Sequence, residues 1–133
     1  MFKNIDHIGI AVKDLQAAKA LFERLTGQKV AHEESVPTEK VNTAFIQIGN
    51  TKLELLEPMN GEGPMAKFIE KRGEGIQQMA FEVADIDAEM ARLKSAGFEL
   101  LSDQPKLGAN NTKVFFIHPR SANGILVEVL QKS

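Results

Sequence analysis

The segment Asp6-His7-Ile8-Gly9-Ile10-Ala11-Val12 decides the fold of this chain, because a later segment repeats its pattern. The later segment reads Gln77-Gln78-Met79-Ala80-Phe81-Glu82-Val83, and Gln78 stands 71 residues after His7 in a chain of 133. The apolar positions are copied, whereas glutamine replaces the histidine. Because an internal repeat bears on the whole fold, the copying predicts the architecture and the replacement bears on the chemistry.

The residues around the first copy predict a strand, a helix and three further strands. Residues 5–12 alternate as a strand does, with His7 and Gly9 on one face. A helix follows, with Asp14 as its N-cap and Gly27 at its end. The three further strands are expected at residues 29–34, 41–48 and 52–56.

The same order of elements follows the second copy. A strand is expected at residues 76–83, and Asp85 caps a helix that Gly97 closes. Three more strands are expected at residues 98–101, 113–118 and 125–130, with a loop at 105–111. Between the two halves, a short helix is expected at residues 65–72, entered at Pro64.

Both halves therefore have the order β-α-β-β-β, which predicts an α+β fold of two paired βαβββ modules. We expect one domain, with module one at about 1–58, a linker at about 59–74 and module two at about 75–133. A half of this size buries little core by itself. Two halves packed about a pseudo-two-fold axis would share a core and form a cleft between them.

Composition excludes several classes of function. A formal net charge of −2 gives no basic surface for nucleic acid. The absence of cysteine excludes disulfides, thiolate metal sites and a cysteine nucleophile. No apolar run approaches the ~20 residues of a membrane span, and the first residues lack the apolar stretch of a signal peptide. These observations predict a protein of the cytoplasm with no membrane partner.

Two glutamates occupy matching places in otherwise aliphatic strands. Glu128 lies within Ile125-Leu126-Val127-Glu128-Val129-Leu130, and Glu54 lies within Leu53-Glu54-Leu55-Leu56. Burying an unpaired carboxylate costs several kcal/mol. Each glutamate must therefore be paired, bound to a metal, or open to solvent or a cleft.

His7 gains its interest from these glutamates and from its repeat mate. A histidine on a strand is by itself more often a structural residue than a ligand. If the two halves pair, however, His7, Glu54, Gln78 and Glu128 converge from four strands on one cleft. An imidazole with carboxylate and amide oxygens suits Mn²⁺, Co²⁺, Ni²⁺ or Zn²⁺. His118 and His32 are interpreted as a structural residue and a surface residue.

The chain resembles the vicinal oxygen chelate superfamily, which includes the glyoxalases and bleomycin-resistance proteins, and within it the methylmalonyl-CoA epimerase group. The resemblance covers nearly the whole chain, and its first motif, residues 7–15, is common to the superfamily. Two further motifs are specific to the epimerase group. They are Gly49-Asn50-Thr51-Lys52-Leu53-Glu54-Leu55-Leu56-Glu57-Pro58 and Ala66-Lys67-Phe68-Ile69-Glu70-Lys71-Arg72-Gly73-Glu74-Gly75.

The resemblance implies an isomerase that interconverts the epimers of methylmalonyl-CoA by 1,1-proton transfer at the α-carbon of an acyl-CoA thioester. It also implies a divalent metal ion and a homodimer. His7, Glu54 and Glu128 match the ligand positions of the family. The fourth ligand is normally the second of two adjacent histidines, and here Gln77 and Gln78 stand in their place.

Three interpretations follow from this difference: an active epimerase with weaker or harder metal preference, a related enzyme with another substrate, or a metal-free descendant. For an active epimerase, Glu128 is the residue expected to act as both ligand and acid/base group. The alternatives are a lactoylglutathione lyase-like enzyme and a catalytically inactive protein of the same fold that binds a small molecule.

Overall fold

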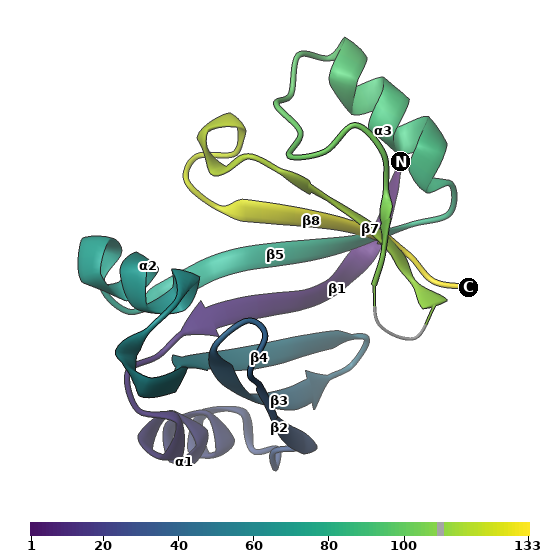
Figure 1. The fold of residues 1–133 in the computed structure, drawn as a ribbon. Helices are drawn as coiled ribbons and strands as arrows, with labels where there is room; N and C mark the ends of the chain where they lie inside the picture. The colour runs from purple at the N-terminus through teal and green to yellow at the C-terminus, as the bar shows by residue number, and fades with distance from the viewer. Residues whose placement is uncertain (109–110) are drawn as a thin grey trace. The chain divides into compact units, whose positions relative to one another are not determined.

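The computed structural model describes residues 1–108 and 111–133, and these residues form two compact units (Figure 1). The N-terminal unit is the continuous stretch His7–Gln77. The C-terminal unit joins Met1–Asp6 to Gln78–Ser133. The chain therefore changes unit twice, once within β1 (Phe2–Ala11) and once within β5 (Gly75–Val83). Residues 109 and 110, part of the predicted loop at 105–111, lie outside the described residues.

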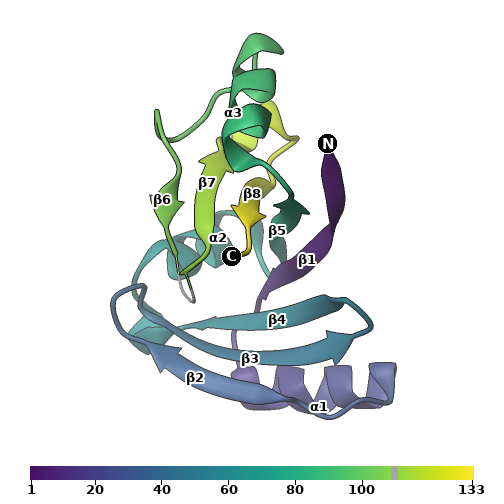
Figure 2. The same cartoon turned by 90° about the vertical axis from the view of Figure 1, so that its right-hand side faces the viewer.

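The N-terminal unit contains the strands in the order β2-β3-β4-β1. β1 runs parallel to β4, whereas the β2–β3 and β3–β4 pairs are antiparallel. α1 lies along one face of β3 and β4 (Figure 2). After β1, the elements of this unit are α1 (Leu15–Thr26), β2 (His32–Val36), β3 (Val41–Ile48), β4 (Thr51–Pro58), the 3₁₀ turn η1 (Met59–Gly61) and α2 (Pro64–Arg72).

Local signals in the sequence account for the limits of α1 and of the β3–β4 hairpin. The Asp14 side chain accepts a hydrogen bond from the Ala17 backbone N–H at 3.2 Å, and Gly27 ends the helix with a φ of 73°. Gly49 takes a φ of 57° in the two-residue turn between β3 and β4. A positive φ favours glycine, so the predicted cap, helix end and turn are confirmed.

The two faces of this sheet are covered unequally. On one face, α1 packs through Leu15 and Ala18 on Val12, Ala44 and Leu55. On the other face, α2 covers one end of the strands, where Met65 packs on three strand residues, Ala11, Val41 and Leu56. The strands therefore continue beyond α2 with polar side chains on that second face.

The C-terminal unit contains the strand order β5-β8-β7-β6. β5 is parallel to β8, and the β6–β7 and β7–β8 pairs are antiparallel. One face of α3 packs through Ile86, Met90 and Leu93 on a core that includes Phe115 and Val129. After β5, the elements are α3 (Ile86–Ser95), β6 (Lys106–Leu107), β7 (Lys113–Ile117), the 3₁₀ turn η3 (Pro119–Ser121) and β8 (Leu126–Gln131).

The edge of the C-terminal sheet differs from the prediction. Residues 98–101 form one isolated bridge, between Leu100 and Ile117, instead of a strand. Pairing with β7 is interrupted at Ser102–Pro105 and resumes in β6, inside the predicted loop. Turn-forming residues explain the interruption, because the Ser102 hydroxyl donates to the Gln104 carbonyl and Pro105 has no N–H to offer a neighbouring strand.

The structural repeat extends to the helix caps. Asp14 and Asp85, 71 residues apart, cap α1 and α3 in the same way. In addition, the Leu15 N–H donates to Glu57 Oε2 at 2.7 Å, and the Ile86 N–H donates to Gln131 Oε1 at 2.8 Å. Glu57 and Gln131 each follow the last residue that pairs the two parallel strands of their unit. In each unit, the side chain at this position thus accepts a hydrogen bond from the first turn of the helix.

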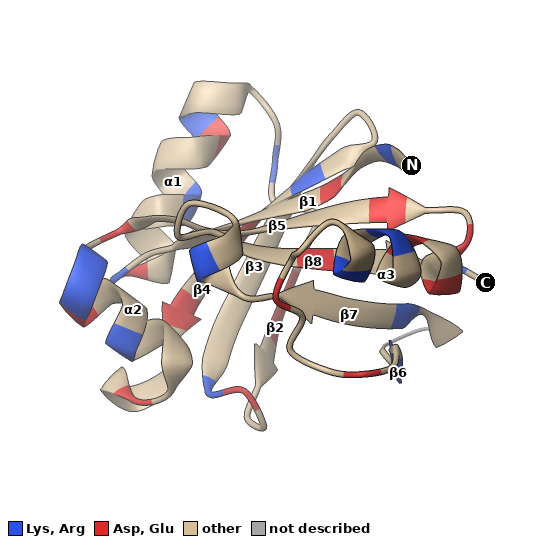
Figure 3. Cartoon of the chain, turned by 90° about the horizontal axis from the view of Figure 1, so that it is seen from above, with Lys and Arg blue, Asp and Glu red and all other residues tan. Residues whose placement is uncertain are grey.

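Charged residues of both signs occur along α2 and α3, so neither helix presents a single sign of charge (Figure 3). None of the described helices is long and apolar enough to cross a membrane.

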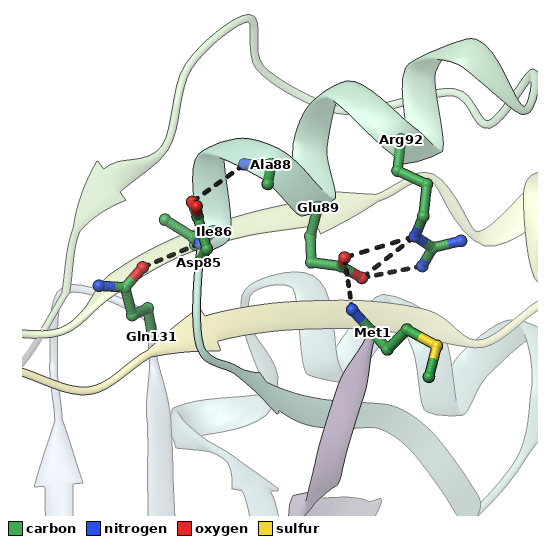
Figure 4. A network of polar contacts seen from close by, with 7 residues as sticks. All are labelled: Met1, Asp85, Ile86, Ala88, Glu89, Arg92 and Gln131. Atoms are coloured by element: carbon green, nitrogen blue, oxygen red, sulfur yellow. Dashed lines mark hydrogen bonds and ion pairs between the residues drawn. The ribbon is translucent and has the colours of Figure 1, made fainter.

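The most buried carboxylate of α3 belongs to Glu89, whose side chain is 7% exposed. It accepts hydrogen bonds from Arg92, the shortest at 2.9 Å, and from the amino group of Met1 at 2.7 Å (Figure 4). The hydrogen bond from Arg92 and that from the amino group lower the pKa of the Glu89 carboxyl, against the opposing effect of burial. The charged form of Glu89 therefore stabilises the folded C-terminal unit.

Replacing Glu89 should remove a pH-dependent part of this stability. A carboxyl with a lowered pKa in the folded state stabilises fully above its unfolded pKa, and that stabilisation is lost as pH falls through the folded pKa. We expect Glu89→Gln to lower the free energy of unfolding by about 1–2 kcal/mol at pH 7, because solvent screens its exposed partners, Arg92 and the Met1 amino group. The difference from the wild type should shrink below about pH 4.5, as measured by urea unfolding at several pH values.

Glu99→Gln is the matched control, because Glu99 also accepts two hydrogen bonds from an arginine, Arg120, but its side chain is 45% exposed. Solvent screens an exposed pair, so Glu99→Gln should change the free energy of unfolding little at any of these pH values. A difference for Glu89→Gln that stays constant from pH 7 to pH 3 would show that its charge is not the cause.

Candidate functional site

His7 and Glu54 meet on the parallel pair β1–β4 and form what we call the first half-site. In this pair, Lys52 lies opposite His7, and Gly9 lies opposite Glu54. Because side chains alternate along a strand, His7 and Glu54 lie diagonally on the same face. His7 Nδ1 is 3.6 Å from Glu54 Oε2, and the side chains are 11% and 25% exposed.

This distance suits two ligands of one metal ion better than it suits a hydrogen bond. A nitrogen–oxygen distance of 3.6 Å is beyond the usual hydrogen-bond range. Two ligands that each lie about 2.1 Å from one metal are roughly 3.0–3.4 Å apart at octahedral or tetrahedral angles. A small movement of either side chain would therefore complete a two-ligand arrangement.

Gln78 and Glu128 form the second half-site, on the parallel pair β5–β8. Leu126 lies opposite Gln78, and Ala80 lies opposite Glu128. This is the register of the first half-site, residue for residue, since Gly9 and Ala80 are repeat mates 71 residues apart. Gln78 and Glu128 consequently lie diagonally on one face, and both are half-buried.

Each half-site lies within its own unit. The chain enters the N-terminal unit at His7 and returns to the C-terminal unit at Gln78. Within residues 1–108 and 111–133, no group of three or more His, Asp or Glu side chains is close enough to hold a metal ion. The structure thus brings the four predicted site residues together as two pairs.

Two residues that sequence reasoning missed share the face of the first half-site. Phe45 lies opposite Glu54 across β3–β4, and Lys52 precedes Glu54 by two residues. The Lys52 ammonium nitrogen lies 5.2 Å from the centre of the Phe45 ring, within the range of a cation–π contact. The two-residue period of the strand was the available signal, because it places Lys52 on the face of Glu54.

Gln77, the neighbour of Gln78, has a buried side-chain oxygen with no hydrogen-bond partner in the described part of the chain. Comparison with the repeat-related position explains why this oxygen lacks a donor. The mate of Gln77 is Asp6, a buried residue whose carboxylate lies 2.8 Å from Lys132 Nζ. The position that corresponds to Lys132, 74 residues earlier, holds Pro58, which has no donor.

His118 and Arg120 support the local structure around η3. His118 Nδ1 accepts a hydrogen bond from the Arg120 N–H at 3.1 Å, so the ring caps this turn. The Arg120 side chain donates two hydrogen bonds of 2.8 Å to Glu99, and these lower the pKa of the Glu99 carboxyl. His32 is exposed, as expected of a surface residue.

A shallow pocket of about 410 Å³ lies elsewhere in the N-terminal unit, at the start of α1. Its lining includes Glu33, Glu34 and Glu57 but neither His7 nor Glu54. Three carboxylates make it unsuited to an anionic ligand, and Glu57 already binds the first turn of α1. The half-sites are therefore the better candidates for chemistry.

Comparison with known proteins shows what this chain is similar to. The ethylmalonyl-CoA/methylmalonyl-CoA epimerase of Cereibacter sphaeroides is 42% identical over 98% of this chain and 99% of its own. The crystal structure of methylmalonyl-CoA epimerase from Mycobacterium tuberculosis has a TM-score of 0.84 at 34% identity, over 99% of this chain and 89% of that chain.

A variant of Streptomyces coelicolor methylmalonyl-CoA epimerase, solved in complex with 2-nitronate-propionyl-CoA, has a TM-score of 0.85 at 33% identity. The match covers 100% of this chain and 96% of that one. These likenesses confirm the predicted α+β glyoxalase fold. Residues 6–116 match the model of the glyoxalase/bleomycin resistance protein/dioxygenase superfamily, and the chain belongs to that superfamily.

Proposed function

We propose that this protein is an epimerase of the methylmalonyl-CoA type, which moves a proton at the α-carbon of an acyl-CoA thioester. The observation that carries the proposal is the pairing of His7 with Glu54 at 3.6 Å, in a register that Gln78 and Glu128 repeat. The named epimerases among the relatives support the same reaction and an acyl-CoA substrate.

We propose that His7, Glu54, Gln78 and Glu128 are ligands of a divalent metal ion. Their donors are one imidazole, two carboxylates and one amide, a set that suits Co²⁺, Mn²⁺, Ni²⁺ or Zn²⁺. When bound, the metal acts as a Lewis acid that stabilises negative charge on the thioester oxygen. The amide of Gln78 is a poorer donor than imidazole toward the later metals, so Mn²⁺ should compete better here than at a site with two histidines.

In the proposed reaction, side chains of the protein transfer the α-proton of the substrate. The α-proton of methylmalonyl-CoA lies between a thioester and a carboxylate, and its removal creates an enolate next to an existing negative charge. Epimerisation removes the proton on one face and returns a proton on the other. We assign Glu128 to one of these transfers, and Glu54 or a water molecule to the other. A homodimer and a cytoplasmic location remain predictions.

Glu128→Ala tests the role of Glu128 in proton transfer. Loss of a positioned acid/base group should lower the rate by about 10²- to 10⁴-fold. The measurement is deuterium uptake at the α-carbon of methylmalonyl-CoA in deuterated water, followed by mass spectrometry. Glu99→Ala, which removes an exposed carboxylate of the same unit, should leave the uptake unchanged; near-normal uptake by Glu128→Ala would reject the assignment.

Gln78→His tests whether position 78 is a metal ligand. Because imidazole is the better donor toward Co²⁺, we expect the variant to bind Co²⁺ roughly tenfold more tightly in calorimetric titration. Gln77→His is the matched control, since adjacent strand residues point to opposite faces and the new ring should leave the Co²⁺ affinity as it was. Equal gains in both variants, or none in either, would remove Gln78 from the ligand set.

A further inference from the structure

Lys52 places a cation directly beside the first half-site. It lies opposite His7 on β1 and two residues before Glu54 on β4, so its side chain shares their face of the sheet. Neighbouring strands are roughly 5 Å apart. A ligand group held near His7 and Glu54 is therefore within reach of the Lys52 ammonium.

The contacts of Lys52 differ from those of other lysines in the same unit. Lys19 lies 2.8 Å from Glu33, and Lys40 lies 2.9 Å from Glu62. Lys52 makes no ion pair with any part of the chain that the structure describes; its contact is with the Phe45 ring. It is also half-buried, so its ammonium is held by an aromatic face with no carboxylate to balance its charge.

In the second half-site, an aliphatic residue takes the place of Lys52. The residue opposite Gln78 is Leu126, which corresponds to Lys52 in the repeat. The register is the same in both units, so the difference arises from the side chain alone. Position 52 therefore supplies a cation to the first half-site, whereas the corresponding position 126 supplies an aliphatic side chain to the second.

We propose that Lys52 binds the free carboxylate of the acyl group and so selects acyl-CoA thioesters that carry a second carboxylate. This inference rests on the proposed function and adds a residue that determines specificity. An ammonium near that carboxylate would also reduce its repulsion of the negative charge formed when the α-proton leaves. Binding of a coenzyme A phosphate by Lys52 is the competing outcome, and the experiment separates the two.

The experiment compares two ligands, malonyl-CoA and propionyl-CoA, which share coenzyme A but differ in the carboxylate. Affinities are measured by calorimetry for the wild type, Lys52→Met and Lys52→Arg. Hydrogen bonds to charged groups contribute enough that Lys52→Met should bind malonyl-CoA about 10- to 100-fold more weakly. Its affinity for propionyl-CoA should stay within about twofold, and Lys52→Arg should retain most of the preference for malonyl-CoA.

Two controls keep the result interpretable. Lys67→Met removes an exposed lysine of α2 and should change neither affinity. Lys52→Gln repeats the test with a polar side chain if Lys52→Met unfolds at a lower temperature than the wild type. Far-ultraviolet circular dichroism and thermal unfolding check the folding of each variant.

The outcomes separate this inference from the proposed function. If Lys52→Met weakens both ligands equally, Lys52 contacts coenzyme A and the inference is wrong. If the wild type prefers malonyl-CoA and Lys52→Met keeps that preference, the inference is wrong while the proposed function stands. If the wild type binds neither ligand, the proposed function is rejected and the inference with it.

Discussion

The parallel pairing of β1 with β4, and of β5 with β8, is the constraint on which the rest of the structure depends. Parallel neighbours cannot be joined by a tight turn, so each pair requires a long connection. The chain supplies it in both units as a helix followed by antiparallel strands. The same pairing places Glu54 opposite Gly9 and Glu128 opposite Ala80, which sets both half-sites before any side-chain chemistry is considered.

Backbone register has been copied more faithfully than side chains. The two parallel pairs share one register, and Asp14 and Asp85 cap their helices alike. At repeat-related positions, however, Gln78 replaces His7 and Leu126 replaces Lys52. Backbone hydrogen bonds tolerate such changes, because the ladder uses only main-chain N–H and C=O groups. The fold can therefore stay symmetric while the two half-sites acquire different donors and charges.

Local signals predicted the elements well where a single residue determines the outcome. Asp14 and Asp85 cap helices because a short carboxylate reaches the free N–H groups of the first turn. Gly27 and Gly73 end helices with φ values of 73° and 78°, which glycine adopts at little cost. The elements of both units therefore follow largely from short stretches of sequence.

Predictions failed where distant contacts decide. The edge next to β7 splits into the bridge at Leu100 and β6, because pairing at an edge depends on a neighbour that no local pattern specifies. Lys52 was missed for a similar reason, since its interest comes from His7 across the strand pair.

The residues beside the two repeat-related glutamates, Glu54 and Glu128, differ between the two half-sites. Glu54 shares its face of the sheet with the imidazole of His7 and the ammonium of Lys52. At the corresponding positions, Glu128 has the amide of Gln78 and the aliphatic side chain of Leu126. The repeat thus kept both glutamates but varied their neighbours. This variation is what the proposed roles require, since Lys52 is proposed to bind a substrate carboxylate and no lysine occupies the corresponding position beside Glu128.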